Sequence, residues 1–389
     1  MRDFIYNIPT KVYFGKDQLH HLGEELKRFG NKVLLTYGGG SVKRTGLYDR
    51  VVNEINKAGL ELYELSGIEP NPKVSSVNAG AKLCKEHDID VILAVGGGSV
   101  IDASKFMAAG RFYDGDCWDF HGKRVPIEKA LPLVTVLTIA ATGSEMDTGG
   151  VITNPETHQK LGRGSELLRP AVSFLDPTNT YTVSRYQTAC GSADILSHIM
   201  ETYFSYEKGM YLTDTAMVGL MKTVIKYAPI ACEEPDNYEA RSNLMWASSW
   251  AINDFIRMDK GKNPWICHPI EHELSAFYDI THGLGLAIVT PRWMKKVLSE
   301  ETLDRFVEFG IEVWEIDYNL PKIEIALEAI RCLEDFFYKD LGLTDNLTDL
   351  GITDEYFDIM AERVSNYSGE PRYTTLSKQD VLDILNACL

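Results

Sequence analysis

The first half of the chain alternates short apolar runs with stretches in which apolar residues recur at helical spacing. Val33–Tyr37 is an apolar run, and Tyr48–Ala58 follows it with helical spacing. The same alternation continues with further predicted strands at Glu61–Leu65, Val91–Val95 and Leu133–Thr138, and further predicted helices at Val74–His87 and from Ser99 through Ala109. Alternating strands and helices predict a parallel sheet with helices on both faces.

The second half of the chain has a different pattern. From about Ser184 the apolar residues recur at helical spacing, and the patterns typical of strands fade. Asp176-Pro177 followed by Thr178–Ser184 is a candidate hinge. A chain of 389 residues is long enough for two separate cores. We therefore predict an α/β domain at residues 1–182 and an all-helical domain at residues 183–389.

Charge and cysteine content narrow the environment and the partners. The formal net charge of −17 repels nucleic acid and anionic lipid, which argues against both as partners. The N-terminus carries no apolar signal segment, and the longest apolar run, around Leu131–Ala141, is too short to span a bilayer. The seven cysteines include no C-x-x-C pair, which fits a reducing compartment. We expect a cytoplasmic protein.

A glycine-rich loop joins the predicted strand at Val91–Val95 to the helix that follows. Gly97, Gly98 and Ser99 lie in this loop, and Ser99 is a natural N-cap for the helix. Glycines let the backbone approach a phosphate, and a helix N-terminus offers free N–H groups to its charge. The loop is not the Rossmann fingerprint, because residue 101 is isoleucine. The alternative is a tight strand-to-helix turn without a ligand.

A second glycine loop bears on the choice of cofactor. Gly38, Gly39 and Ser41 follow the strand Val33–Tyr37, and Lys43 and Arg44 come shortly after them. No carboxylate ends that strand, although in dinucleotide-binding folds an acidic residue there grips the ribose 2′-hydroxyl and repels a 2′-phosphate. The loop therefore favours NADP over NAD, unless it is only a surface turn with solvated charges. A third, hydroxyl-rich stretch at Thr138–Glu145 is suited to lining a cofactor groove.

Histidines and one aspartate in the second half have the spacing of metal ligands. Asp194 and His198 are four residues apart in a helical stretch, and so are His268 and His272, with His282 shortly after. One carboxylate with several imidazoles suits a borderline divalent metal such as iron or zinc. The alternative is a set of packed or surface histidines. Cys267 is a weaker candidate, because it points to a different helix face from His268.

These motifs together resemble the group III iron-containing alcohol dehydrogenase family, in particular its branch of butanol dehydrogenases and NADPH-dependent aldehyde reductases. The resemblance runs over nearly the whole chain. The matching pieces are the opening strand at Pro9–Gly15, Gly96-Gly97-Gly98-Ser99-x-x-Asp102-x-x-Lys105, Thr142-Gly143-Ser144-Glu145, Leu175-Asp176-Pro177, Asp194-x-x-x-His198, and His268-x-x-x-His272 with Thr281-His282-Gly283. Pro269 departs from the family, which commonly continues a helix after the first of these histidines.

The resemblance implies a set of site residues. The metal ligands fall on Asp194, His198, His268 and His282, while His272 lies near the metal without being a ligand. Cofactor contacts fall on Gly38, Gly39, Ser41 and Asn71 for the adenosine, Gly97, Gly98 and Ser99 for the pyrophosphate, and Asp102, Thr138, Thr142 and Lys160 for the nicotinamide half. The family also implies a dehydroquinate-synthase-like fold, an active site in the cleft between the domains, and a homodimer.

The expected activity is hydride transfer between NADPH, with NADH as the second possibility, and an aldehyde or primary alcohol such as butanal or butanol. His272 is the candidate proton relay. The alternative on the same fold is an NAD-dependent lyase or cyclase of the dehydroquinate synthase type, which would need a basic pocket for an anionic substrate. The aromatic residues Trp118, Phe120, Trp250, Phe255 and Trp265 favour a neutral substrate. A nucleotide-sensing module, the remaining alternative, would not need the aspartate and histidine set.

Overall fold

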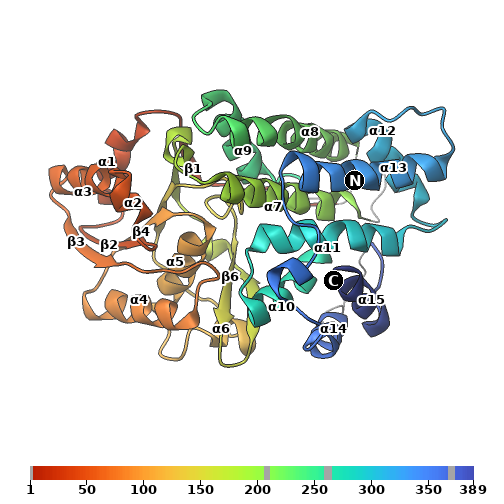
Figure 1. Cartoon of the computed structure of the whole chain (residues 1–389). Helices are drawn as coiled ribbons and strands as arrows, with labels where there is room; N and C mark the ends of the chain where they lie inside the picture. The colour runs from red at the N-terminus through yellow and green to blue at the C-terminus, as the bar shows by residue number, and fades with distance from the viewer. Residues whose placement is uncertain (1–2, 206–210, 258–264, 367–372) are drawn as a thin grey trace. The chain divides into compact units, whose positions relative to one another are not determined.

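The computed structural model describes residues 3–205, 211–257, 265–366 and 373–389, which fold into two compact units (Figure 1). The first, an α/β unit, contains residues 7–183 together with residues 235–253. The second, a helical unit, contains residues 184–234 and 254–389, joined by the N-terminal residues up to Tyr6. The division into continuous domains at residues 182 and 183 remains a prediction. By their contacts, residues 235–253 group with the first half of the chain.

A six-stranded sheet forms the centre of the α/β unit. Its strands are β1 (Lys11–Phe14), β2 (Lys32–Tyr37), β3 (Glu61–Leu65), β4 (Val91–Gly96), β5 (Leu133–Leu137) and β8 (Val172–Leu175). Their order is β1-β8-β5-β4-β2-β3, and every neighbouring pair is parallel. The register places Val95 level with Tyr37 and with Val136. The loops that follow β2, β4 and β5 therefore leave the same edge of the sheet.

Helices cover both faces of this sheet, as the alternation of patterns predicted. On one face α1 (Leu22–Lys27) and α3 (Leu47–Lys57) pack against the odd-numbered side chains of β4, such as Leu93. On the other face α4 (Val74–Glu86) and α5 (Gly98–Gly110) pack against Ile92 and Ala94. All six residues of β4 are buried, which explains its continuous apolar sequence. The predicted parallel sheet is confirmed.

The remaining elements of the α/β unit are η1 (Gln18–His21), α2 (Ser41–Arg44), α6 (Asp119–Gly122), the antiparallel hairpin β6 (Gly149–Asn154) and β7 (Gln159–Gly164), η2 (Glu166–Leu168), η3 (Pro177–Thr180) and α9 (Tyr238–Trp250). The sequence gives no sign of this hairpin. Its two strands contain four glycines, which are depleted in strands and give no alternating pattern. The sequence also gives no sign that α9 packs in this unit, where Trp246 meets Phe14 with ring centroids 5.5 Å apart.

The helical unit contains α7 (Arg185–Tyr203), α8 (Tyr211–Glu233), α10 (Cys267–Tyr278), α11 (His282–Val297), α12 (Leu303–Trp314), α13 (Lys322–Asp335), the π-helical turn η4 (Phe336–Asp340), η5 (Thr348–Leu350), α14 (Phe357–Asn366) and α15 (Lys378–Ala387). No strand occurs among its described residues, so the all-α prediction is confirmed. Ser184 caps α7 by accepting the N–H of Gln187 at 3.2 Å. The helix is then buried from Thr188 to Tyr203, which makes it the core of the unit.

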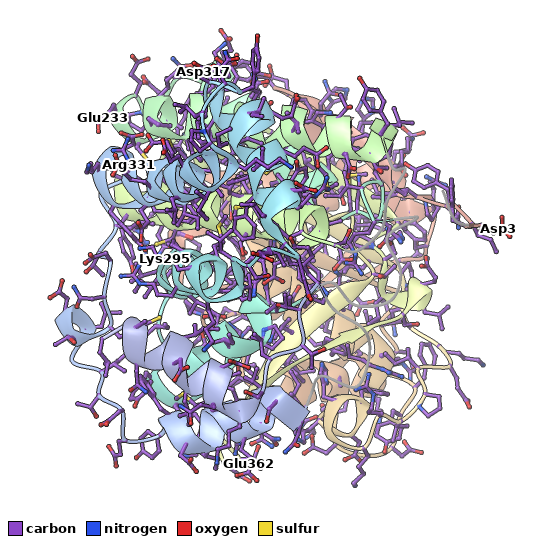
Figure 2. The ribbon with its side chains drawn as sticks, turned by 90° about the vertical axis from the view of Figure 1, so that its right-hand side faces the viewer. Asp3, Glu233, Lys295, Asp317, Arg331 and Glu362 are labelled. Atoms are coloured by element: carbon purple, nitrogen blue, oxygen red, sulfur yellow. The ribbon has the colours of Figure 1, made fainter. Side chains whose placement is uncertain are left out.

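Charged side chains occupy the outside of the helical unit, where Figure 2 labels Glu233, Lys295, Asp317, Arg331 and Glu362. Several of them form surface ion pairs, including Arg185 with Glu233 at 3.1 Å and Lys295 with Glu334 at 2.6 Å. Such pairs contribute little to stability, and their main effect is solvation. In the described part of the chain, no helix has the length and apolar character needed to cross a membrane.

One close approach fixes the position of α11 against α7. Gly283 lies directly on the backbone of Cys190, and a Cβ atom at position 283 would stand 1.9 Å from the Cys190 carbonyl oxygen. A backbone oxygen inside a buried helix cannot move aside as a flexible side chain would. Position 283 therefore accepts only glycine if the two helices are to keep their spacing.

We expect Gly283→Ala to destabilise the protein by about 1–3 kcal/mol or more, because the added methyl group overpacks the contact between α7 and α11. Denaturant unfolding measures the change. The matched control is Gly219→Ala in α8, where a Cβ would meet nothing within 4 Å. That exposed substitution should stabilise by roughly 0.5–1 kcal/mol through helix propensity. Equal unfolding curves for the two variants would contradict the role assigned to Gly283.

Candidate metal centre and cofactor loops

Three histidine side chains converge on one carboxylate oxygen in the helical unit. The Oδ1 atom of Asp194 lies 3.6 Å from His198 Nε2, 3.8 Å from His268 Nε2 and 3.6 Å from His282 Nε2. These separations are too long for hydrogen bonds. Ligand atoms about 2.1 Å from a shared tetrahedral ion stand about 3.4 Å apart. Asp194, His268 and His282 lie close enough to one another to hold a metal ion, and His198 joins them through its approach to Asp194 Oδ1.

Each ligand candidate is placed by a different feature of the helices. Asp194 and His198 lie one turn apart on the buried helix α7, so their side chains share a face. His268 is the second residue of α10, and His282 is the first residue of α11. The contact of Gly283 with α7 carries His282 to the same place. The structure thus brings together all four residues that the family resemblance implied as ligands.

The electrostatics of this cluster also favour a cation. Asp194, His198 and His268 are buried, and Asp194 Oδ1 and both ring nitrogens of His268 have no hydrogen-bond partner among the described residues. Burial opposes the charge of Asp194, but the three imidazoles outweigh it and hold its pKa well below the usual range. Burial likewise opposes protonation of His268, yet the Glu201 and Asp194 carboxylates raise its pKa to about 9. The electrostatics of the cluster therefore favour a positive charge at this site.

The departure at Pro269 is accommodated by a carboxylate from α7. Pro269 is the third residue of α10, in the first turn, where a helix has no internal partner for its N–H groups. Glu201 accepts the N–H groups of Ile266 at 3.2 Å and His268 at 2.9 Å, and also that of Cys267. Proline has no N–H, so all positions of the first turn are satisfied. The helix starts regularly in spite of the proline.

Two buried glutamates touch the histidine ligands on the side away from Asp194. Glu201 Oε2 lies 3.2 Å from His268 Nδ1, and Glu271 Oε2 contacts His282 Nδ1 directly. Their side chains are 1% and 0% exposed. The sequence analysis missed both residues. The one available signal was the spacing of Glu201, seven residues after Asp194 and on the same helix face.

His272 stands beside the cluster and outside the group that surrounds Asp194. Its ring centroid is 5.5 Å from that of His282 and 6.1 Å from that of His268, and its side chain is half-buried. It approaches Glu271 and His282 closely enough for these three to form a second possible ligand group. The Cys267 thiol, a weaker ligand candidate, is fully buried, and burial raises its pKa well above the ordinary value.

The aromatic residues that favoured a neutral substrate are placed differently from one another. Trp265 packs against the metal-site histidines, with centroids 5.6 Å from His198 and 4.7 Å from His268, and the Arg257 guanidinium lies over its ring at 5.1 Å. Phe120 is buried in the core of the α/β unit. In the helical unit, Trp265 therefore packs against two of the candidate metal ligands.

In the α/β unit, the loop after β4 leads into the N-terminus of α5. The N-cap is Gly97 and not Ser99 as the sequence suggested, and no side chain caps this helix end. A Cβ at Gly97 would stand 2.4 Å from Ile139 Cγ2, and one at Gly98 would stand 2.3 Å from Thr142 Oγ1. The glycines thus let the loop that carries Thr142 pack against the start of α5. The uncapped N–H groups of this 13-residue helix suit a phosphate.

The remaining residues assigned to the nicotinamide half have partners inside the unit. Asp102 accepts the Ser144 hydroxyl at 2.5 Å and the Val151 N–H at 2.8 Å, so both carboxylate oxygens are engaged. Burial raises the pKa of Asp102, and Lys105 opposes this. Thr138 donates its N–H to Gly96 at 3.1 Å, and Lys160 is buried in β7. Asp102 therefore fastens two neighbouring segments.

The loop after β2 is open on its outer side. A Cβ at Gly39 would meet nothing within 4 Å, and Ser41 begins α2 as an exposed residue. Gly38 precedes them, and a Cβ there would lie 3.1 Å from the Ile68 carbonyl oxygen. Asn71 is buried and adopts a left-handed conformation with φ of 48°. The four residues assigned to the adenosine thus come from the loops after β2 and β3.

Comparison with known proteins identifies the family. A family model described as "Iron-containing alcohol dehydrogenase" matches residues 9–177, and one described as "Fe-containing alcohol dehydrogenase family, C-terminal" matches residues 188–389. This chain belongs to the iron-containing alcohol dehydrogenase family. It is 49% identical to an NADH-dependent butanol dehydrogenase A of Clostridium acetobutylicum over 99% of both chains. It is 35% identical to the NADPH-dependent aldehyde reductase YqhD of Escherichia coli over 90% of both chains.

Solved structures agree with this assignment. The crystal structure of an NADH-dependent butanol dehydrogenase A from Thermotoga maritima matches with a TM-score of 0.95 at 39% identity, covering 100% of this chain and 99% of the other. The expected dehydroquinate-synthase-like fold is confirmed, and so is the expected class of activity, a nicotinamide-linked oxidoreductase of aldehydes and alcohols. The comparisons do not favour the lyase or cyclase alternative.

We expect His282→Ala to lose bound metal and His272→Ala to retain it. The first variant removes one of the four atoms around the proposed ion, whereas the second removes a neighbouring ring. Elemental analysis of both purified variants beside the wild type checks the metal content. His272→Ala should then lose rate by roughly 10- to 10⁴-fold, as for a lost proton relay. A His282→Ala protein with a full complement of metal would contradict the ligand assignment.

Proposed function

We propose that this protein is a metal-dependent reductase of small neutral aldehydes, such as butanal, which it converts to primary alcohols at the expense of NADPH or NADH. The observation that supports this most directly is the convergence of three imidazoles on Asp194 Oδ1, in a chain whose relatives bear the names of butanol dehydrogenases and aldehyde reductases. Iron and zinc both suit this donor set.

The helical unit contributes the metal ligands and the groups that orient them. A divalent metal held by Asp194, His198, His268 and His282 would supply Lewis-acid polarisation of a carbonyl oxygen. The buried surroundings of three of these residues exclude water and strengthen their electrostatic effect. Trp265 lies against the His268 ring and offers an apolar surface to the carbon chain of a substrate.

Reduction of an aldehyde also requires a proton at the carbonyl oxygen. His272 is half-buried and stands beside the His282 ring without joining the group around Asp194. We assign His272 the role of proton donor, because an imidazole can exchange protons near neutral pH. Its ring is not one of the three that surround Asp194 Oδ1.

The α/β unit contributes the cofactor site. A nicotinamide dinucleotide would supply the hydride. The uncapped N-terminus of α5, at Gly97, Gly98 and Ser99, suits its pyrophosphate, and the hydroxyls of Thr138 and Thr142 suit the nicotinamide half. Asp102 acts here by holding Ser144 and Val151, which keeps the loop that carries Thr142 in place.

The test of this function is reduction of butanal by the metal-loaded enzyme. The reaction is monitored through the loss of absorbance of the reduced nicotinamide. We expect butanal to be a better substrate than succinic semialdehyde, since the latter adds a carboxylate that the net-acidic protein repels. Treatment with a chelator should abolish turnover, and Fe²⁺ or Zn²⁺ should restore it. Turnover unaffected by metal removal, or no oxidation of the nicotinamide at all, would overturn the proposal.

The preference between the two nicotinamide cofactors depends on the loop after β2. Gly38 carries no carboxylate to repel a 2′-phosphate, which supports NADPH. Against this, the relative at 49% identity is named NADH-dependent and the one at 35% NADPH-dependent. Lys43 lies over the rings of Tyr48 at 4.5 Å and Tyr37 at 5.1 Å, so its charge is partly engaged. We keep NADPH as the cofactor that the loop itself favours.

We expect the wild type to have a higher kcat/KM with NADPH than with NADH, and Gly38→Asp to move this ratio toward NADH by weakening NADPH binding. The φ angle of Gly38 is not positive, so a side chain there adds no backbone strain of that kind. Gly38→Asn is the matched control, because it has the same shape as aspartate without the charge. A wild type that favours NADH tenfold would contradict this interpretation of the loop.

The cysteines bear on the compartment in which the enzyme works. All seven cysteines are free, and six of them are buried, which supports a reducing compartment such as the cytoplasm. The homodimer implied by the family resemblance is part of the same proposal.

A further inference from the structure

We propose that Glu201 and Glu271 are positioning residues of the metal centre, each holding the Nδ1 proton of one histidine ligand so that its Nε2 lone pair faces Asp194. The inference rests on the metal site proposed above. It adds two residues that are not among the four ligands assigned around Asp194. The contacts of Glu271 with His282 and of Glu201 with His268 carry it.

The chemistry of imidazole explains why such partners matter. A neutral imidazole bears one proton, on either Nδ1 or Nε2, and only the unprotonated nitrogen can bind a metal. A carboxylate that accepts from Nδ1–H fixes the proton there, fixes the ring plane and increases the basicity of Nε2. In both residues Nδ1 faces a glutamate and Nε2 faces Asp194. His282 Nδ1 is hydrogen-bonded to Glu271, whereas Glu201 approaches His268 Nδ1 at 3.2 Å as an ion-pair contact without a hydrogen bond.

Glu271 is fixed on both of its carboxylate oxygens. Oε2 contacts His282 Nδ1, and Oε1 accepts the hydroxyl of Ser275 one turn later in α10. Gly285 of α11 provides the space for this side chain, because a Cβ at position 285 would stand 2.7 Å from Glu271 Cγ. A fully buried carboxylate is costly unless it accepts hydrogen bonds, so the contact with His282 stabilises Glu271 as well as the ring.

Glu201 connects His268 to the start of its own helix. The same carboxylate accepts the backbone N–H groups of Ile266, Cys267 and His268 and approaches His268 Nδ1 at 3.2 Å. Its negative charge also stands at the positive end of the α10 dipole. Backbone and side chain of His268 are therefore placed by one group, which itself lies on the helix that carries Asp194 and His198.

The charge balance supports a role toward a metal. Asp194, Glu201 and Glu271 bring three buried carboxylates to a cluster whose other members are imidazoles. Three negative charges in a buried space require compensation, which a divalent cation on the Nε2 side and the polarised Nδ1–H groups provide. Glutamates that served packing alone would not need to face the ring nitrogens.

The experiment compares metal binding by E271Q, E201Q and a matched control, E273Q. Glu273 lies in the same helix and is also buried, but it pairs with Arg363 at 3.1 Å. The metal-free proteins are titrated with Co²⁺, whose visible absorption reports both the dissociation constant and the ligand geometry. We expect E271Q and E201Q each to weaken Co²⁺ binding about 10- to 100-fold and to change the Co²⁺ spectrum, as loss of such partners does. E273Q should match the wild type in both.

Thermal unfolding of the metal-free proteins separates this role from a purely structural one. E201Q also weakens the N-terminal cap of α10 and should lower the midpoint temperature of unfolding. E271Q is therefore the more direct test. The double variant E201Q/E271Q should bind Co²⁺ more weakly than either single variant, and its departure from the product of the two losses measures their coupling through the shared metal. E271Q that binds Co²⁺ as tightly as E273Q, with the wild-type spectrum, would overturn the inference. A wild type that binds no Co²⁺ would instead overturn the metal site on which it rests.

Discussion

The negative charge of Asp194, placed on a helix buried along most of its length, is the constraint on which the helical unit depends. An isolated carboxylate in such surroundings would be strongly destabilising. Three imidazoles turn toward it, and the Glu201 and Asp194 carboxylates together raise the pKa of His268 to about 9 against the effect of burial. In the absence of a metal, a proton on His268 therefore balances part of this charge. A metal ion must displace that proton, which couples metal binding to pH in the direction of weaker binding in acid.

The architecture around this charge is set by backbone contacts as much as by ligands. Gly283 brings α11 against the carbonyl of Cys190, and Gly285 leaves room for Glu271. Each of these two glycines after His282 is therefore required by a different close contact. A similar close contact occurs in the α/β unit, where the absence of a Cβ at Gly98 lets Thr142 pack against the start of α5. In both units, glycines flank candidate site residues because two segments approach too closely for a Cβ. Their role is close packing, and the helical glycines among them need no unusual backbone conformation.

The sequence could predict those features that depend on local periodicity. The strands β2 to β5 and the helices α3, α4 and α5 end within about two residues of the expected positions, since each is a run of one periodicity. The spacing of Asp194 and His198 similarly predicted a shared helix face. The hairpin β6–β7 has too many glycines to show a pattern, and α9 joins the α/β unit through contacts such as Trp246 with Phe14 that no local pattern encodes. Glu201 and Glu271 are two of 56 acidic residues, and apart from the spacing of Glu201 after Asp194 only their distances to His268 and His282 distinguish them.

The cofactor loop shows how a local prediction depends on residues from a neighbouring strand. In the sequence, Lys43 adds positive charge close to Gly38 and favours a 2′-phosphate. In the structure, Glu64 of β3 accepts the hydroxyls of Tyr37 at 2.9 Å and Tyr48 at 2.7 Å, and this hydrogen bond raises the pKa of Tyr48 to about 12. The ammonium group of Lys43 lies over the same two rings. Glu64 thus neutralises part of the charge that the loop offers to a phosphate, through a strand that is adjacent in the sheet and more than twenty residues later in the chain. The missing carboxylate at position 38 and the compensated lysine therefore favour opposite cofactors.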